Sequence, residues 1–179
     1  MLKIRPKNDL SHILLCDKCH LSETRKQIVI GRGDMPADVL FIGEAPGRSE
    51  DLLGEPFIGQ AGKLFEKILY GVRATLKNNF TYYITNTILC RPCSPEDENR
   101  PPSPEEVLQC RPNLLSVVKK VNPKKVVFIG KIADLYFRWM FPGALTILHP
   151  AYLLRTGGER SPNFILEIKI LQNYLKEIL

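Results

Sequence analysis

Short apolar runs recur along the chain and predict the strands of a buried sheet. The first is VLFIG, inside residues 34–44, which ends at a glycine and is expected to lead into a loop. Further strands are predicted at residues 81–85, 124–130 and 144–148. A short continuous apolar run such as the first is typical of a parallel strand covered on both faces.

Helical patterns lie between these runs. Residues 61–77 place apolar side chains three and four positions apart, and helices are also predicted at residues 131–140 and 162–178. This spacing puts the apolar side chains on one face of a helix, which then packs on the sheet.

A polar, proline-rich stretch at residues 91–104 predicts a loop that leads into another helix. Ser103 is expected to cap this helix and Pro104 to occupy its first position. Acidic residues follow in the first turn, where they oppose the helix dipole, and the helix should run to about Val121.

Strands that alternate with helices predict an α/β protein. We expect a three-layer α/β/α domain with a central, mainly parallel four-stranded sheet, formed by residues 1–179 as a single domain. Ligands of such sheets bind beyond the carboxyl ends of the strands. Three features fall at those ends: the GEAPG segment at residues 43–47, Asn86 and His149.

Composition narrows the class of protein. The 179 residues have an apolar fraction of 44% and a net charge of +6, which is weak evidence for a polyanionic partner. No apolar run approaches the length of a membrane span, and the first residues do not resemble a secretory signal. We therefore expect a cytoplasmic protein that does not bind membranes.

The five cysteines indicate a metal site, because an intracellular chain rarely uses so many thiols for disulfides. Cys16 and Cys19 form one CxxC pair, and Cys90 and Cys93 form another. On spacing alone, two such pairs favour a four-cysteine zinc site over an iron–sulfur cluster.

Three motifs carry more specific information than the composition. GEAPG continues through a long glycine-rich loop to PFIGQAG, and it fits neither a phosphate-binding Walker loop nor a dinucleotide fingerprint. TNTILCRP lies at residues 85–92, and HPAYLLR lies at residues 149–155. Together these motifs resemble those of the family-four uracil-DNA glycosylases, which carry an iron–sulfur cluster, and the resemblance extends from about Cys16 to Arg155.

The resemblance implies a [4Fe-4S] cluster, for which four thiolates are the usual ligand set. Its ligands would be Cys16, Cys19, Cys90 and Cys110, because the family places the fourth cysteine in the following helix. Cys93 would then be a spare thiol. The expected role of the cluster is structural, holding the N-terminal arm and the loop at residues 91–110 near DNA.

The resemblance also implies a reaction, the hydrolysis of the bond between uracil and deoxyribose. Phe57 would stack on uracil, while Gly43 and Asn86 would contact it, the amide pairing with the edge that distinguishes uracil from cytosine. His149 would stabilise the departing uracil anion.

A carboxylate is expected to orient the attacking water. Better-known glycosylases have an aspartate at the position of Ala45, so that group is missing here. Glu44 is the first candidate and Glu50 the second, although Glu50 could instead exclude thymine by crowding the uracil ring.

DNA contacts are implied as well. Leu153 would wedge into the gap left by the flipped base, and a buried core leucine is the alternative. Arg155 and the backbone amides from Gly59 to Gly62 would contact phosphate. The partner would be uracil-containing DNA, single- or double-stranded, bound by a monomer near the nucleoid, with a sliding clamp as a candidate partner.

Three alternatives stay open. A non-catalytic protein could retain the fold and bind DNA, and a zinc-ribbon protein could use the same cysteines. A related branch cross-links to uracil-DNA, but it carries glutamine at the position of Ala45 and a basic, histidine-containing loop. The loop SPEDENRPPSP is acidic and has no histidine, which argues against that branch.

Overall fold

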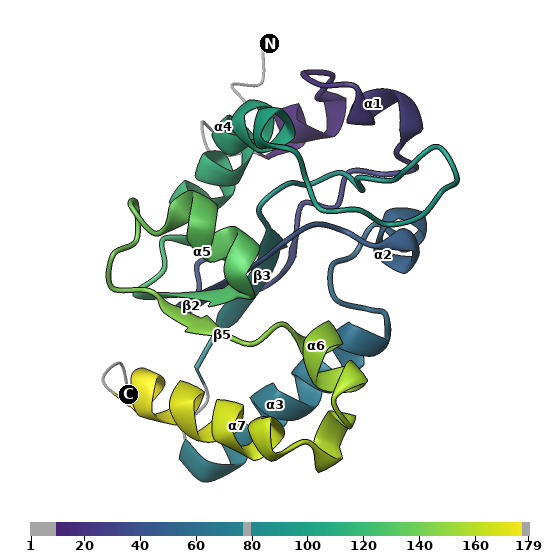
Figure 1. Cartoon of the computed structure of the whole chain (residues 1–179). Helices are drawn as coiled ribbons and strands as arrows, with labels where there is room; N and C mark the ends of the chain where they lie inside the picture. The colour runs from purple at the N-terminus through teal and green to yellow at the C-terminus, as the bar shows by residue number, and fades with distance from the viewer. Residues whose placement is uncertain (1–9, 77–79, 177–179) are drawn as a thin grey trace.

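A twisted five-stranded sheet forms the centre of the computed structural model, which describes residues 10–76 and 80–176 (Figure 1). The strand order is β1-β3-β2-β4-β5. All neighbouring pairs are parallel except β1 and β3, which are antiparallel. The strands are β1 (Arg32–Gly33), β2 (Val39–Gly43), β3 (Tyr82–Asn86), β4 (Lys125–Ile129) and β5 (Leu145–Ile147).

Helices cover both faces of the sheet, so the predicted three-layer α/β/α fold is confirmed (Figure 1). Side chains of α4 and α5 share one core with the sheet, and side chains of α3 and α7 share the other. The helices are η1 (Ser11–Leu15), α1 (Leu21–Thr24), α2 (Arg48–Leu53), α3 (Gln60–Leu76), α4 (Pro104–Val121), α5 (Lys131–Phe137), α6 (Pro150–Arg155), η2 (Gly158–Arg160) and α7 (Pro162–Leu175). The last predicted positions of two helices, 77 and 177–178, lie outside the described residues.

The start of α4 shows how neighbouring residues determine where a helix begins. The Ser103 hydroxyl accepts a hydrogen bond from the Glu106 amide at 3.2 Å, and the Glu106 carboxylate accepts one from the Ser103 amide at 2.7 Å. This capping box satisfies two amides that the helix itself leaves unpaired. The predicted cap at Ser103 is therefore confirmed.

The prediction of four strands is wrong by one edge strand. β1 contains only Arg32 and Gly33, too few residues to show any periodicity. Gly31 before the strand and Gly33 within it allow β1 to lie directly on β3: a Cβ on Gly31 would be 2.3 Å from the Tyr83 ring, and one on Gly33 would be 2.1 Å from the Tyr82 carbonyl oxygen. The packing of these glycines, rather than an apolar pattern, creates the strand.

None of the helices within residues 10–76 and 80–176 combines the length and apolar character that a membrane crossing requires.

Candidate active site

A cleft of about 610 Å³ lies at the carboxyl edge of the parallel strands. It brings together the three features that the sequence places at strand ends, since Glu44, Asn86 and His149 all line it. The glycine-rich loop after β2 supplies much of the rest of its wall, including Phe57. The expectation that these distant segments meet at one edge is confirmed.

Asn86 ends β3 with an amide oxygen that has no partner. The side chain is 1% exposed, and its Oδ1 is buried without a hydrogen bond among the described residues. Gly43 lies opposite Asn86 in the neighbouring strand. A Cβ on Gly43 would lie 2.5 Å from Oδ1 and 2.6 Å from the Phe57 ring, so the glycine leaves room between amide and ring. Burying an oxygen without a hydrogen bond costs free energy, so Oδ1 is a candidate acceptor for a hydrogen bond from a ligand.

Phe57 is held in a left-handed backbone conformation (φ 55°), which is rare for a bulky residue. Arg32 of β1 donates through Nε to the Pro56 carbonyl oxygen at 2.9 Å. On the other side of Phe57, one Glu50 oxygen accepts from the amides of Ile58 and Gly59 at 3.1 and 2.9 Å. These contacts fix the loop on both sides of the ring.

Gly62 at the start of α3 packs against the same loop. A Cβ at this position would lie 1.8 Å from the Phe57 carbonyl oxygen, so the backbone would have to move. We expect Gly62→Ala to lower the free energy of unfolding by about 1–3 kcal/mol, as overpacking typically does. Gly143→Ala is the matched control, because a Cβ on Gly143 meets nothing within 4 Å. Denaturant unfolding of both variants tests this, and equal stability of the two would contradict it.

His149 caps α6 with its side chain, since Nδ1 accepts a hydrogen bond from the Ala151 amide at 3.2 Å. In a neutral imidazole the proton is then on Nε2, which is free to donate. Burial, assisted by the positive charge of Arg155, lowers the pKa of His149. The ring also lies against Gly130, whose Cβ would be 3.1 Å from that of His149. His149 is thus an oriented, neutral hydrogen-bond donor beside Phe57, at 6.2 Å between ring centroids.

The two candidate carboxylates differ in their surroundings. Glu44 lines the cleft, and burial raises its pKa. Glu50 also lines the cleft, but its Oε1 already accepts two backbone hydrogen bonds. A carboxylate that holds a loop in this way has less freedom to bind water, so the geometry favours Glu44 for that role.

Arginines border the cleft. Arg155 lines it, as the sequence suggested, and so do Arg48 and Arg100, which sequence reasoning missed. Asp97 bridges Arg48 and Arg91, with 2.5 Å between the charged atoms of each pair. These ion pairs tie the loop at residues 91–103 to the start of α2, and no motif signals them because the partners are distant in sequence.

The wedge interpretation of Leu153 requires correction. Its side chain is 0% exposed and belongs to the core between the sheet, α3 and α7. Tyr152 and Leu154 are the exposed large hydrophobic side chains of α6, and Tyr152 lines the cleft. The backbone amide of Gly59 is likewise already donated to Glu50, although Gly59 and Gly62 both line the cleft.

A second cavity is lined by the thiols of Cys16, Cys19, Cys90 and Cys110. Cys93 is not among its lining residues. Burial, opposed by Arg25, raises the pKa of Cys90 to about 11, with Cys19 and Cys16 adding to the rise. In residues 10–76 and 80–176, no three His, Cys, Asp or Glu side chains are grouped to hold a metal ion. The cavity nevertheless gathers the four predicted ligands and excludes the fifth cysteine.

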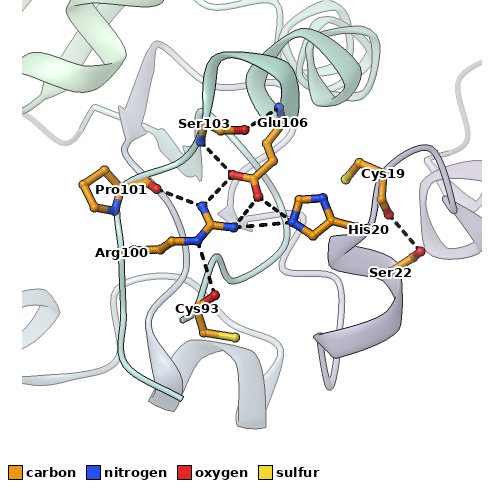
Figure 2. A network of polar contacts seen from close by, with 8 residues as sticks. All are labelled: Cys19, His20, Ser22, Cys93, Arg100, Pro101, Ser103 and Glu106. Atoms are coloured by element: carbon orange, nitrogen blue, oxygen red, sulfur yellow. Dashed lines mark hydrogen bonds and ion pairs between the residues drawn. The ribbon is translucent and has the colours of Figure 1, made fainter. Parts of the chain in front are cut away.

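Polar side chains connect this cavity with the cleft (Figure 2). Glu106, which lines the cavity and is 1% exposed, accepts hydrogen bonds from Arg100 at 2.5 and 3.0 Å. His20, next to Cys19, lies 3.0 Å from the same carboxylate. Burial alone would raise the pKa of Glu106, but the Arg100 and Ser103 hydrogen bonds hold it below its usual range. The network joins the N-terminal arm, the loop at residues 91–103 and α4.

The fold and the cleft together define a protein that binds a planar ring with hydrogen-bonding groups. The cleft at the carboxyl edge of the parallel strands contains the ring of Phe57, the unpaired amide oxygen of Asn86 and the neutral imidazole donor of His149. Such a site suits a flat ring that carries hydrogen-bonding groups, and the arginines at its border suit an attached anion.

Sequence comparisons identify the family. Residues 30–170 match the Uracil DNA glycosylase superfamily. The chain is similar to type-4 uracil-DNA glycosylases of Archaeoglobus fulgidus (41% identical over 68% of this chain), Saccharolobus solfataricus (32% over 76%) and Thermotoga maritima (31% over 90%). The matched part spans 57%, 69% and 90% of these relatives, respectively. The chain belongs to the uracil DNA glycosylase superfamily, which confirms the resemblance seen in its motifs.

Proposed function

We propose that this protein excises uracil from DNA by hydrolysing the N-glycosidic bond, leaving an abasic site. The observation that carries the proposal is the buried, unpartnered Oδ1 of Asn86 beside Phe57 and His149 in one cleft. The relatives named type-4 uracil-DNA glycosylases support it. To reach such a cleft, the nucleotide must be flipped out of the base stack.

Recognition of uracil is assigned to Phe57, Asn86 and Gly43. The Phe57 ring offers a face for stacking, and the Asn86 amide offers both a donor and an acceptor. Cytosine has an amino group in place of the uracil O4, so a fixed amide would leave a polar group unpaired. That mismatch costs about 1–3 kcal/mol, enough for useful discrimination.

Catalysis is assigned to His149 and to a carboxylate. As the bond to the sugar breaks, negative charge develops on uracil, and the Nε2–H of neutral His149 is placed to stabilise it. Glu44 is the proposed group that orients water and offsets positive charge on the sugar. Glu50 is assigned to the loop that carries Phe57, whose adjacent amides it binds.

DNA binding is assigned to the border of the cleft. Arg155 and Arg48, which line the cleft, are the proposed phosphate contacts, with the backbone near Gly62 at the start of α3, whereas Arg100 already donates to Glu106. We extend the proposal to single- or double-stranded uracil-containing DNA as substrate. We further propose a monomer that forms one domain, acts in the cytoplasm at the nucleoid, and has a sliding clamp as a candidate partner.

The thiols of Cys16, Cys19, Cys90 and Cys110 are the proposed ligands of a [4Fe-4S] cluster. Four thiolates are the usual ligand set of such a cluster, and these four thiols line one cavity from which Cys93 is absent. When bound, the cluster supplies a covalent cross-link between the N-terminal arm and the rest of the domain. Arg100 and Glu106 then connect that cross-linked region to the cleft.

Strand scission tests the proposal. Anaerobically purified protein is mixed with labelled single- and double-stranded oligonucleotides that each contain one uracil, and alkali then cleaves any abasic site. We expect scission at uracil and none at thymine. Binding without scission would instead support the non-catalytic alternative, which also accommodates an intact cleft. A protein–DNA adduct that survives denaturation would place the chain in the cross-linking branch.

A further inference from the structure

The thiols of the second cavity accept hydrogen bonds from side chains to which the proposed function gives no task. Asn113 of α4 is 4% exposed, and its Nδ2 donates to the Cys16 sulfur at 3.1 Å. Arg25, which follows α1, donates through Nη1 to the Cys90 sulfur at 3.7 Å. Both side chains line the cavity together with the thiols. Two of the four proposed metal ligands therefore have a side-chain donor on their sulfur atom.

Arg25 also binds the backbone on the other side of the cavity. Its Nη2 donates to the Cys16 carbonyl oxygen at 2.7 Å. One guanidinium thus spans Cys16 and Cys90, which are distant in sequence. Together with Asn113, it joins the N-terminal arm, the segment after β3 and helix α4. These contacts hold the segments whose thiols have to meet around a metal.

The charge of Arg25 suits a bound thiolate. Cysteine binds metal as the thiolate, so its sulfur carries negative charge. Burying that charge costs free energy unless a hydrogen bond or an opposite charge compensates for it. Cys90 is 7% exposed, and Arg25 supplies both. Of the other charged side chains that line the cavity, Lys18 donates to no thiol within the described part of the chain, and Glu106 is already paired with Arg100.

We propose that Arg25 and Asn113 are positioning residues of the metal centre, which hold the sulfur atoms of Cys90 and Cys16 in the bound state and slow the loss of metal. The inference rests on the proposed function, because it concerns the same four thiols. Groups that hydrogen-bond to metal ligands orient them, and losing such a group typically costs about 10- to 100-fold in metal affinity. Neither side chain needs to bind the metal, since each acts through a sulfur that does.

Substitutions that preserve the size of each side chain test this role. Asn113→Leu removes the donor to Cys16. Arg25→Met removes the charge and both donors, whereas Arg25→Lys keeps the charge. When iron-loaded protein is titrated with a chelator, we expect Asn113→Leu and Arg25→Met to lower the concentration that removes half of the iron by about 10- to 100-fold. Arg25→Lys should lie between Arg25→Met and the unsubstituted protein, because an ammonium cannot reproduce the fork of a guanidinium.

Gln109→Leu is the matched control for a change in this wall of the cavity. Gln109 lies on α4 one turn before Asn113 and lines the same cavity, but it donates to no thiol among the described residues. It should retain iron within about 3-fold of the unsubstituted protein. Thermal unfolding identifies any variant that fails to fold. Equal losses of iron in Asn113→Leu and Gln109→Leu would overturn the proposal.

The reduction potential of the iron-loaded protein reports on the hydrogen bonds themselves. A donor to a cluster sulfur stabilises the reduced, more negative state, so its removal should lower the potential. We expect lower midpoint potentials in Asn113→Leu and Arg25→Met and no change in Gln109→Leu, as measured by a spectroscopic redox titration. A loss of fold stability alone would not produce this pattern. Unchanged potentials in folded Asn113→Leu and Arg25→Met would refute the positioning role.

Metal retention separates this inference from the proposed function. It is measured without DNA, so it remains valid if the unsubstituted protein excises no uracil. If the unsubstituted protein holds zinc and no iron, the proposed cluster fails. Asn113→Leu and Arg25→Met should then still release zinc to the chelator about 10- to 100-fold more readily, because the same sulfur atoms bind it. Zinc retention equal to that of Gln109→Leu would overturn the inference in that case.

Discussion

Replacing His149 by alanine is expected to lower the rate of uracil excision by about 10²- to 10³-fold, the usual effect of losing one preorganised donor to a developing anion. The neutral ring presents Nε2–H because Nδ1 is already occupied by the Ala151 amide. Alanine also removes the ring that packs beside Phe57. Single-turnover scission of the uracil oligonucleotide measures the loss, with thermal unfolding as a check on folding.

His12→Ala is a suitable control, since His12 lies in η1 and is not among the residues that line the cleft. It should leave the rate of excision within about 3-fold, as surface changes away from a site usually do. A rate for His149→Ala within the same range would remove the histidine from the mechanism.

The pH dependence of the rate follows from the same residue. Burial and Arg155 lower the pKa of His149 below its ordinary value of 6.5, so the neutral form persists as the pH falls through that value. Because the neutral imidazole is the proposed active form, protonation of His149 should not reduce the rate at pH 6.5, and a loss of activity at that pH would instead come from protonation of Glu44, whose pKa burial raises. A rate that rises on acidification would show that the charged imidazole is the active form.

Replacing Cys110 by serine is expected to abolish binding of an iron–sulfur cluster, whereas replacing Cys93 should not. Cys110 lines the cavity with the other three thiols, and Cys93 does not. Burial raises the pKa of Cys110 to about 12, and its thiol accepts a hydrogen bond from the Leu89 amide at 3.3 Å. Iron must therefore displace a proton from a buried thiol, and serine offers no comparable ligand.

Iron and sulfide analysis of anaerobically purified protein, with the visible absorption spectrum, measures the result. Cys93→Ser is the matched control, since it removes a thiol from the loop that precedes α4 without touching the cavity. Loss of iron in Cys93→Ser with retention in Cys110→Ser would reverse the assignment. One equivalent of zinc with no iron in the unsubstituted protein would return the site to the zinc interpretation that the spacing alone favours.

Much of the architecture follows from local patterns. The short apolar runs of β2 and β4 predict strands buried on both faces, and the capping box at Ser103 and Glu106 defines the start of α4. Asn86 and His149 could be placed at one edge from the sequence because parallel strands end together. These predictions succeed because the information is contained in a few neighbouring residues.

Other features depend on contacts between distant residues. β1 exists because Gly31 and Gly33 permit close packing on Tyr82 and Tyr83, which no local pattern reveals. Leu153 lies within the HPAYLLR motif, yet the packing of the short helix α6 buries it in the core. Periodicity is uninformative over six residues, so the direction of such a side chain is set by tertiary packing.

The spacing of the four thiols bears on the order in which the molecule is assembled. Seventy residues separate Cys19 from Cys90, and that interval contains β2, β3 and α3. Closing so long a loop costs only about 0.6 kcal/mol more than closing one half its length, and the sheet itself closes a longer one, because Val39 of β2 pairs with Lys125 of β4. The four thiols meet only once the segment that carries Cys16 and Cys19 packs beside α4 and the segment after β3, so the proposed cofactor would be installed on a sheet that already exists. Newly made protein in iron-starved cells should accumulate with its central sheet formed and its N-terminal arm open to proteases.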